Sequence, residues 1–336
     1  MSQVEALQDA FLRTLSWLMT RADGGGKLIL LMYHRVLSAK DPLLPSVPDA
    51  AQFDWQMALL HRAFRVLPLT EAVRLMRTDG LPSRAVCVTF DDGYADNYQI
   101  AFPILKRWGI SATFFVATGF LDGGRMWNDS VIETVRRWQG GMMDLTDLGL
   151  TSYPVATPAE RRATVEAILS QWKYLSFGDR DDQVMRLAEL CGAELPRDLM
   201  MTSAQVAELH REGMEIGAHT ITHPILTRID DGRAAREIVQ SKTDLEAVVG
   251  APVRTFAYPN GNPRKDYERC HVDMVRDAGF EAAVSTAWGC AKPDRDRLQL
   301  PRIWPWDRTP FRYGLRMLSS YRAPAAGAVV ATPFDG

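Results

Sequence analysis

The chain has 336 residues, 46% of them hydrophobic, which is enough to bury a large core in one or two domains. A formal net charge of −2 gives no support for nucleic acid as a partner, because such a partner favours a basic patch. The cysteines lack paired spacing, which argues against a disulfide framework or a zinc knuckle and suits a reducing compartment.

The first part of the chain, residues 1–26, predicts an amphipathic helix followed by a flexible glycine linker. Apolar residues between Leu7 and Met19 recur near helical spacing, and Gly24, Gly25 and Gly26 follow. We see neither a signal-peptide pattern nor a membrane-spanning run. Such a helix packs on its own domain or lies at a membrane surface, and its polar face has few of the basic residues typical of the second case.

Buried strands alternate with helices through most of the remaining chain. Continuous apolar runs predict strands at 27–33, 85–90, 112–117, 214–219, 253–258, 281–285 and 298–303. Helical patterns lie between them at 53–64, 69–77 (capped by Thr70), 97–108, 202–213, 233–249 and 267–278. This alternation predicts parallel β/α units, in which functional side chains gather at the C-terminal ends of the strands.

The alternation breaks between about 121 and 200, where the sequence predicts a helical insertion with a lid as one conceivable role. Ser130 with Glu133, and Thr157 with Glu160, have the spacing of capping boxes at helix starts. The main domain is therefore expected to span 27–322 around this insertion. The Ala-, Pro- and Gly-rich segment 323–336 predicts a flexible tail.

Two adjacent carboxylates, Asp91 and Asp92, follow the strand at 85–90. Neighbouring carboxylates repel each other unless a cation or a shared proton relieves the repulsion. Taken alone, Asp91-Asp92-Gly93 is equally well an ordinary turn that ends a strand. However, Tyr33 and His34 end the first strand in the same way, so both polar clusters are expected at one edge of the sheet.

A pair of histidines, His219 and His223, follows another predicted strand. A lone pair at this spacing is often found on a surface or in a cap. Combined with the carboxylates it forms a common ligand set for Zn²⁺ or a similar divalent ion that keeps an open position for water. One Asp is then free to act as a base on the metal-bound water.

These motifs together resemble one known family. Thr89-Phe90-Asp91-Asp92-Gly93, His219-xxx-His223 and Tyr258-Pro259-Asn260-Gly261 resemble the polysaccharide deacetylases, also described as the NodB homology domain or carbohydrate esterase family 4. The resemblance covers about 27–120 and 200–305. It implies an α/β fold, a distorted (β/α) barrel, that removes N-acetyl groups from amino sugars.

The resemblance also implies roles for individual residues. Asp91 would be the general base, and the backbone N–H of Asn260 would help to hold the oxyanion. One divalent metal ion, Zn²⁺ in the first place, with Co²⁺, Ni²⁺ or Mn²⁺ as alternatives, would be held by Asp92, His219 and His223.

The sequence departs from the family pattern in two places. Ala257 stands where the family often has an arginine that orients the base, so Arg302 is the candidate substitute. The family's late catalytic histidine is missing, since no histidine follows His271. A branch that resembles the poly-N-acetylglucosamine deacetylases carries an early Tyr-His, which makes His34 the candidate general acid. The alternative is that His34 only forms structural hydrogen bonds.

Aromatic residues near the site are candidate sugar contacts or simply core side chains. The candidates are Tyr258, Trp304 and Trp306.

The function that this pattern favours is metal-dependent removal of N-acetyl groups from a polysaccharide or glycan precursor. Release of another acyl group and a non-catalytic glycan-binding or scaffold role are the alternatives. The proposed base and all three proposed metal ligands are present (Asp91, Asp92, His219 and His223), which argues against the scaffold role. Because no export signal is seen, we expect a cytoplasmic protein that acts on a glycan or a lipid-linked sugar. Its N-terminal helix would lie near the inner leaflet of the membrane.

Overall fold

The main feature of the computed structural model is a parallel sheet that nearly closes into a barrel. The structure describes residues 11–15, 17–18, 26–192, 194–305, 307–322 and 328. The strand order is β1-β3-β4-β7-β8-β9-β10, with β2 beside β3. A parallel bridge between Leu31 and Ile303 brings the segment after β10 next to β1 and so completes the ring. The strands are β1 Leu28–Tyr33, β2 Arg65–Val66, β3 Ala85–Phe90, β4 Thr113–Val116, β7 Glu215–Ala218, β8 Thr255–Ala257, β9 Ala282–Trp288 and β10 Leu300–Arg302.

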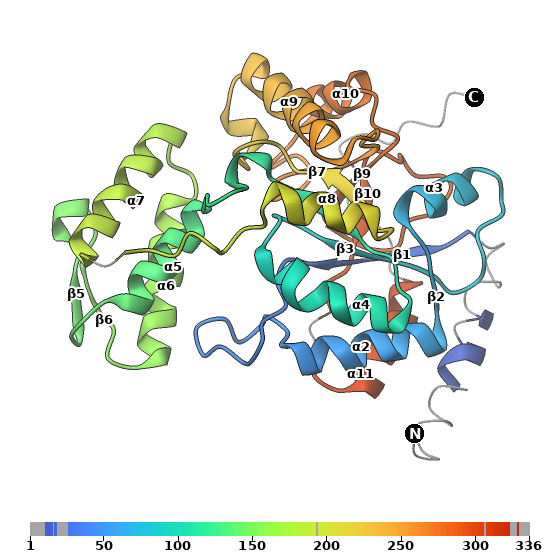
Figure 1. The fold of residues 1–336 in the computed structure, drawn as a ribbon, viewed down its shortest axis with the longest axis horizontal. Helices are drawn as coiled ribbons and strands as arrows, with labels where there is room; N and C mark the ends of the chain where they lie inside the picture. The colour runs from blue at the N-terminus through green and yellow to red at the C-terminus, as the bar shows by residue number, and fades with distance from the viewer. Residues whose placement is uncertain are drawn as a thin grey trace.

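Helices surround this barrel (Figure 1). They are α2 Ala50–Ala63, α3 Leu69–Arg77, α4 Phe102–Trp108, α8 Ser203–Arg211, α9 Asp231–Val249, α10 Arg269–Asp277 and α11 Pro310–Ser320. A π-helical turn, Asn97–Ala101, precedes α4, and Pro103 lies in the first turn of α4. The sequence patterns did not predict α11.

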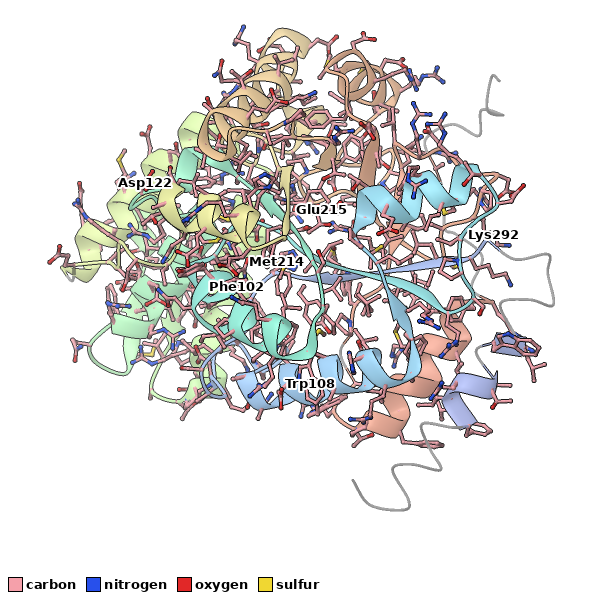
Figure 2. All side chains as sticks on the ribbon, turned by 45° about the vertical axis from the view of Figure 1, so that its right-hand side comes forward. Phe102, Trp108, Asp122, Met214, Glu215 and Lys292 are labelled. Atoms are coloured by element: carbon pink, nitrogen blue, oxygen red, sulfur yellow. The ribbon has the colours of Figure 1, made fainter. Side chains whose placement is uncertain are left out.

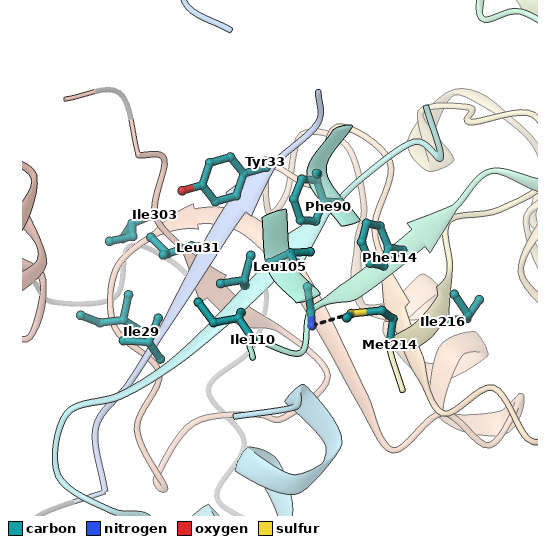
Figure 3. Packing of buried hydrophobic residues seen from close by; sticks show 14 of the residues in the cluster. Ile29, Leu31, Tyr33, Phe90, Leu105, Ile110, Phe114, Met214, Ile216 and Ile303 are labelled. Atoms are coloured by element: carbon teal, nitrogen blue, oxygen red, sulfur yellow. Dashed lines mark hydrogen bonds between the residues drawn. The ribbon is translucent and has the colours of Figure 1, made fainter. Parts of the chain in front are cut away.

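Most residues of the longer strands are apolar because both faces of the sheet are buried. On β1, Ile29 and Leu31 point toward the helices, where they join one core with Leu105 and Ile110 (Figure 3). The alternate residues Leu28 and Leu30 belong to a second core, which includes Ala85, Cys87, Phe115, Ala257 and Val284. This is the burial that a parallel sheet covered on both sides requires, and it leaves the strand ends as places for polar side chains.

Two predicted helix starts are wrong, and at one of them a distant part of the chain supplies the capping contact. Thr70 does not cap α3. The carboxylate of Glu215, at the start of β7 (Figure 2), accepts hydrogen bonds from the N–H groups of Leu69 at 2.6 Å and Thr70 at 3.0 Å. Ser130 lies inside α5 (Trp127–Arg137), whose N-cap is Met126. A side chain from another element can therefore satisfy a helix end that local sequence leaves open.

The inserted segment forms a lobe beside the barrel, at the left of Figure 1. It consists of α5, α6 Pro158–Trp172, α7 Phe177–Cys191 and an antiparallel hairpin of β5 Met142–Asp144 and β6 Ser152–Pro154, which the sequence did not predict. The predicted capping box of Thr157 and Glu160 is present at the start of α6. The lobe has its own core, which includes Val135, Ile168, Trp172 and Leu187.

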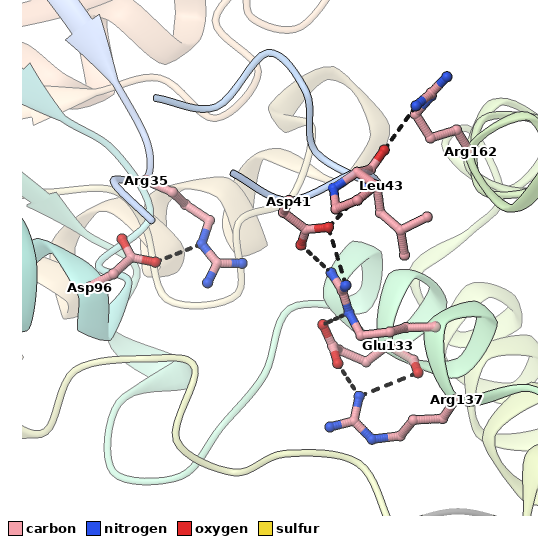
Figure 4. Close-up of polar contacts among 9 residues, drawn as sticks. Arg35, Asp41, Leu43, Asp96, Glu133, Arg137 and Arg162 are labelled. Carbon is pink, nitrogen blue, oxygen red and sulfur yellow. Dashed lines mark hydrogen bonds and ion pairs between the residues drawn. The ribbon is translucent and has the colours of Figure 1, made fainter. Parts of the chain in front are cut away.

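An ion pair and a hydrogen bond attach this lobe to the loop that follows β1 (Figure 4). Arg136 in α5 donates to Asp41 with an Nη2–Oδ2 distance of 2.6 Å, and Arg162 in α6 donates to the carbonyl of Pro42 at 2.9 Å. In the same view, Glu133 lies between Arg136 and Arg137. The lobe is thus held against the chain segment that carries His34.

The described part of the N-terminal helix packs on the last helix of the fold. Leu12 is buried and lies against Gly314 of α11, where a Cβ atom would be 2.5 Å from the Leu12 side chain. Phe11, Trp17 and Leu18 are exposed. No helix in the described ranges is long and apolar enough to cross a membrane. Association of this helix with a membrane surface stays a prediction, and most of the segment 323–336 lies outside the described residues.

Candidate active site

A cavity of about 500 Å³ opens at the C-terminal ends of the strands. It collects predicted site residues from five different strand ends: His34 after β1, Asp91 and Asp92 after β3, His219 and His223 after β7, Asn260 after β8 and Trp304 after β10. Residues far apart in sequence therefore meet where the parallel topology predicts a site.

Three of these side chains are arranged to hold a metal ion. The Nε2 atoms of His219 and His223 each lie 3.5 Å from Oδ1 of Asp92. All three ligand atoms lie within 4.8 Å of one another. Oδ1 of Asp92 is buried and accepts no hydrogen bond from the described residues. A buried carboxylate oxygen without a donor is costly, and a cation between these three ligands would remove that cost.

Hydrogen bonds orient the first histidine for ligation. Nδ1 of His219 lies 2.7 Å from the carbonyl oxygen of Ala257, so it carries the proton and leaves the Nε2 lone pair facing Asp92. Two side chains stabilise the turn that leads to His223. The hydroxyl of Thr220 accepts a hydrogen bond from the His223 N–H. The carboxylate of Glu237, on α9, accepts hydrogen bonds from the N–H groups of Ile221 and Thr222. Sequence patterns gave no signal for Glu237.

The electrostatics of the cluster also fit a ligand set. Burial and the nearby His219 lower the pKa of His223 to about 3, so its imidazole is neutral at pH 7. Burial alone would also lower the pKa of His219, but Asp92 and Asp91 outweigh it and raise that pKa. The carboxylates thus attract positive charge to this point, which a divalent cation would supply in place of a proton.

Strained backbone is concentrated at the same place. Eight non-glycine residues of the described chain have positive φ, and four of them are Asp92, Thr220, His223 and Asn260, with φ of 76°, 63°, 53° and 57°. Such conformations cost free energy and persist where the surrounding structure enforces them. Their grouping indicates that the fold holds these side chains in place for function.

Asp91 is paired with Arg302, the residue that the family resemblance suggested for orienting the base. Two parallel hydrogen bonds of 2.6 Å join the guanidinium to the carboxylate, and Arg302 also donates to Thr89 and to the carbonyl of Ser285. Both side chains are buried. Burial would raise the pKa of Asp91, but the charge and hydrogen bonds of Arg302 outweigh it and lower that pKa below its usual value. Asp91 is therefore ionised at neutral pH, as a general base must be.

Replacing Arg302 with lysine should move the acid side of the pH–activity curve to higher pH. A lysine ammonium cannot make the two parallel bonds, so the pKa of Asp91 should rise and the base should lose its charge earlier as the pH falls. The measurement is kcat/KM as a function of pH. Arg316→Lys, which changes the arginine paired with Asp307 on α11, is the control. An acid limb that stays in place in the Arg302 variant would contradict this role.

His34 lies at the exposed side of the cavity, and neighbouring residues fix its backbone. Nδ2 of Asn97 donates to the His34 carbonyl at 2.8 Å. Asp96 accepts from Arg35 at 2.8 Å and from the N–H of Val36 at 3.1 Å. These contacts place the imidazole among the cavity-lining groups. Its role as general acid stays a prediction.

The remaining predicted contacts have different outcomes. Asn260 lines the cavity, and its N–H donates no hydrogen bond within the described residues, so it is available to an oxyanion. Trp304 lines the cavity and is 49% exposed, as a sugar-stacking residue requires. Trp306 lies outside the described residues.

The prediction that Tyr258 contacts the substrate is wrong. Its ring is buried and stacked on Tyr267, with centroids 3.9 Å apart. Because side chains alternate along a strand, Ala257 points into the barrel and Tyr258 points outward to the helices.

Asp129 is a buried carboxylate next to the cavity that sequence reasoning did not single out. It follows the cavity-lining residues Trp127 and Asn128 in the first turn of α5, and it accepts a hydrogen bond from Tyr94 at 3.2 Å. Its other oxygen has no partner among the described residues. Burial raises the pKa of Asp129 to about 7, although Arg35 opposes the shift.

This buried carboxyl group should make the fold less stable as the pH rises. Since the folded state raises its pKa, Asp129 binds a proton more tightly in the folded chain between about pH 4 and pH 7, and stability falls through that interval by on the order of 4 kcal/mol. Asp129→Asn should remove this loss and be more stable than the wild type at pH 8. Urea unfolding at pH 5 and pH 8 measures it, with the exposed Asp182→Asn as control. If the free energy of unfolding changed by the same amount between pH 5 and pH 8 in the wild type and in Asp129→Asn, this prediction would be refuted.

Comparison with known proteins identifies relatives along most of the chain. The sequence profile of the polysaccharide deacetylase family matches residues 78–146 and 162–283, which include Asp91, Asp92, His219 and His223. YxkH of Bacillus subtilis (strain 168), described as a polysaccharide deacetylase, is 38% identical over 291 residues, covering 86% of this chain and 75% of its own. The poly-β-1,6-N-acetyl-D-glucosamine N-deacetylase of Staphylococcus epidermidis is 34% identical over 110 residues, 28% of this chain and 37% of its own.

Solved structures match the fold. The Streptococcus pyogenes deacetylase PplD, solved in complex with acetate, has a TM-score of 0.59 and 21% identity, over 87% of this chain and 98% of that chain. IcaB from Ammonifex degensii has a TM-score of 0.55 and 22% identity, over 89% of this chain and 98% of that chain. At these identities the likeness concerns the fold alone, and it confirms the predicted (β/α) barrel.

Proposed function

We propose that this chain, which belongs to the polysaccharide deacetylase family, uses one divalent metal ion to hydrolyse the N-acetyl group of an amino sugar in a glycan or glycan precursor. Membership of this family is consistent with a hydrolase that acts on amide C–N bonds. The catalytic arrangement proposed here follows from the cavity. The observation that carries the proposal is the combination of Asp92, His219 and His223 around a buried, unpartnered carboxylate oxygen, next to the ion pair of Asp91 and Arg302.

The residues present fit a divalent ion with mixed nitrogen and oxygen ligands. Two imidazoles and one carboxylate are a common set for Zn²⁺ with an open position, and Co²⁺, Ni²⁺ or Mn²⁺ are the alternatives. When bound, such an ion would act as a Lewis acid and lower the pKa of a coordinated water toward about 7.

The protein's own groups would carry out the proton transfers. Asp91, held ionised by Arg302, would accept the proton of the attacking water as its oxygen adds to the acetyl carbon. The N–H of Asn260 would donate to the carbonyl oxygen as that oxygen gains charge. Cleavage of the C–N bond would release acetate, and His34 would give a proton to the departing amine. One water is consumed, and acetate and the free amino sugar are the products.

The substrate is proposed from the named relatives. The Staphylococcus epidermidis protein is named for the deacetylation of a polymer of N-acetyl-D-glucosamine. The exposed Trp304 at the cavity would stack on a sugar face. We therefore propose an N-acetylated hexosamine, in a polymer or a lipid-linked precursor, as the group that enters the cavity.

The test is an acetate-release assay with the purified, metal-loaded protein on N-acetylated glycans and lipid-linked sugars. We expect acetate and new free amino groups in equal amounts. Absence of acetate from every substrate, in a protein shown to contain its metal, would contradict the proposal and favour a non-catalytic binding role.

A further inference from the structure

A three-residue turn carries the Asn260 N–H that is proposed to donate to the oxyanion. The N–H of Gly261 donates to the carbonyl of Pro259 at 2.6 Å, and Asn260, the central residue, has a φ of 57°. A turn of this length with positive φ at its centre is rare and strained, so it persists only where surrounding groups enforce it. The direction of the Asn260 N–H therefore depends on what holds this turn.

Thr286, on β9, holds the turn from the neighbouring strand. Its hydroxyl donates to the carbonyl of Asn260 at 2.7 Å, and its backbone N–H donates to the carbonyl of Gly261 at 2.9 Å. Thr286 thus binds the two carbonyls that follow the Asn260 N–H along the chain. Because only two soft dihedral angles separate the N–H and the carbonyl of one residue, fixing the carbonyl restricts the direction of the N–H.

The packing around Gly261 leaves the turn little room to move. A Cβ atom at Gly261 would lie 2.9 Å from the carbonyl oxygen of Tyr258, and 3.0 and 3.1 Å from the backbone nitrogen and Cγ2 of Thr286. Gly261 also has a φ of 65°, which favours glycine. The turn and the Thr286 side chain are therefore in close contact, as a positioning role requires.

The same part of β9 also holds the arginine that is paired with the proposed base. Nε of Arg302 donates to the carbonyl of Ser285 at 3.0 Å, and this carbonyl belongs to the same peptide group as the N–H of Thr286. One peptide group thus accepts a hydrogen bond from Arg302 and donates one to Gly261. Hydrogen bonds linked in this way polarise and strengthen one another. The end of β9 therefore sets the position of the turn relative to the Arg302 side chain.

We propose that Thr286 is a positioning residue, whose hydroxyl holds the carbonyl of Asn260 and so directs the Asn260 N–H at the oxyanion. The inference rests on the proposed function and assigns a further residue to that reaction. Thr286 also lines the cavity. Direct contact of its hydroxyl with the substrate is therefore the alternative that the experiment has to separate.

The experiment removes the hydroxyl with Thr286→Val, which nearly keeps the shape of the side chain. A misdirected N–H stabilises the transition state less but leaves substrate binding unchanged. We therefore expect kcat on an N-acetylglucosamine oligomer to fall by about 10- to 100-fold, while KM changes by less than about twofold. Thr286→Ser keeps the hydroxyl and should restore most of the wild-type kcat. Both variants should bind as much zinc as the wild type.

The pH dependence and a matched control provide further readouts. Thr286→Val leaves the two hydrogen bonds between Arg302 and Asp91 in place, so the acid limb of kcat/KM should stay at the wild-type pH, unlike that of Arg302→Lys. Thr227→Val is the control. The hydroxyl of Thr227 also donates to a backbone carbonyl at 2.7 Å, that of Lys265, but Thr227 lies outside the cavity lining. The control should keep the wild-type kcat.

A wild-type kcat in Thr286→Val, or an equal loss in Thr227→Val, would overturn this inference and leave the proposed deacetylation intact. A higher KM at unchanged kcat would also overturn it, because the hydroxyl would then contact the substrate. If the valine variant does not fold, Thr286→Ala compared with Thr286→Ser makes the same test of the hydroxyl. Failure of the wild type to release acetate would instead count against the proposed function itself.

Discussion

Replacing Asp92 with alanine is expected to abolish metal binding at the cavity and to lower acetate release by about 10³-fold or more, the equivalent of the several kcal/mol that a Lewis acid contributes. Asp92 supplies the only carboxylate of the proposed ligand set, and both histidines point their Nε2 atoms at its Oδ1. Without it, two neutral imidazoles remain, which hold a divalent ion weakly.

The measurements are the zinc content of the dialysed protein and kcat on an N-acetylated glycan. Asp79→Ala is a matched control, because Asp79 also has positive φ but lies in the turn after α3, away from the cavity. The control should retain metal and activity. An Asp92→Ala protein that still binds one zinc ion with unchanged affinity would show that the ligand set is misassigned.

Replacing Asp91 with asparagine is expected to lower kcat by about 10²- to 10⁴-fold while metal binding persists, because the residue is assigned as a general base and not as a ligand. The two neighbouring carboxylates are thereby distinguished by experiment. Asparagine has nearly the same shape and keeps an oxygen that accepts from Arg302.

The variant also leaves Arg302 buried without a counter-charge, which can cost about 3–5 kcal/mol of stability. The double variant Asp91→Asn/Arg302→Met removes that charge and serves as the folding control. Both proteins should contain one metal ion and lack activity. Full activity in either protein would rule out Asp91 as the base.

Local sequence predicts the barrel well because its strands are buried on both faces. The run from Leu28 to Met32 has no polar residue, and Asp91 and His219 follow other short, largely apolar runs. Because His34, Asp91 and His219 each follow a predicted strand of a parallel sheet, the chain order places them at one edge of the sheet. The candidate metal ligands were accessible for this reason, together with the family resemblance, and the resemblance alone suggested that Arg302 pairs with Asp91.

Features that depend on distant contacts could not be obtained in this way. Glu215 serves the N-terminus of α3, which local sequence attributed to Thr70. Tyr258 follows a buried strand as the site residues do, yet the alternation of side chains turns it toward Tyr267 in the core. A motif gives the position of a residue along the chain, whereas the face on which its side chain lies is set by packing.

The inserted lobe is the clearest example of this limit. Its helices carry ordinary apolar stripes, which form a core of their own around Val135, Ile168 and Trp172. Lys173 and Arg180, which line the cavity, look like solvent-facing residues of amphipathic helices until the lobe is placed against it. Their place in the cavity wall therefore requires the three-dimensional arrangement.

The most direct test of the central claim is to measure acetate release and metal content together. Purified protein would be stripped with a chelator, then titrated with Zn²⁺, while acetate release from an N-acetylglucosamine oligomer is followed. We predict that the stripped protein is inactive and that activity rises in proportion to bound zinc up to one ion per chain. Stripped protein that retains full activity, or protein that binds one ion without releasing acetate, would contradict a metal-dependent deacetylase built on Asp92, His219 and His223.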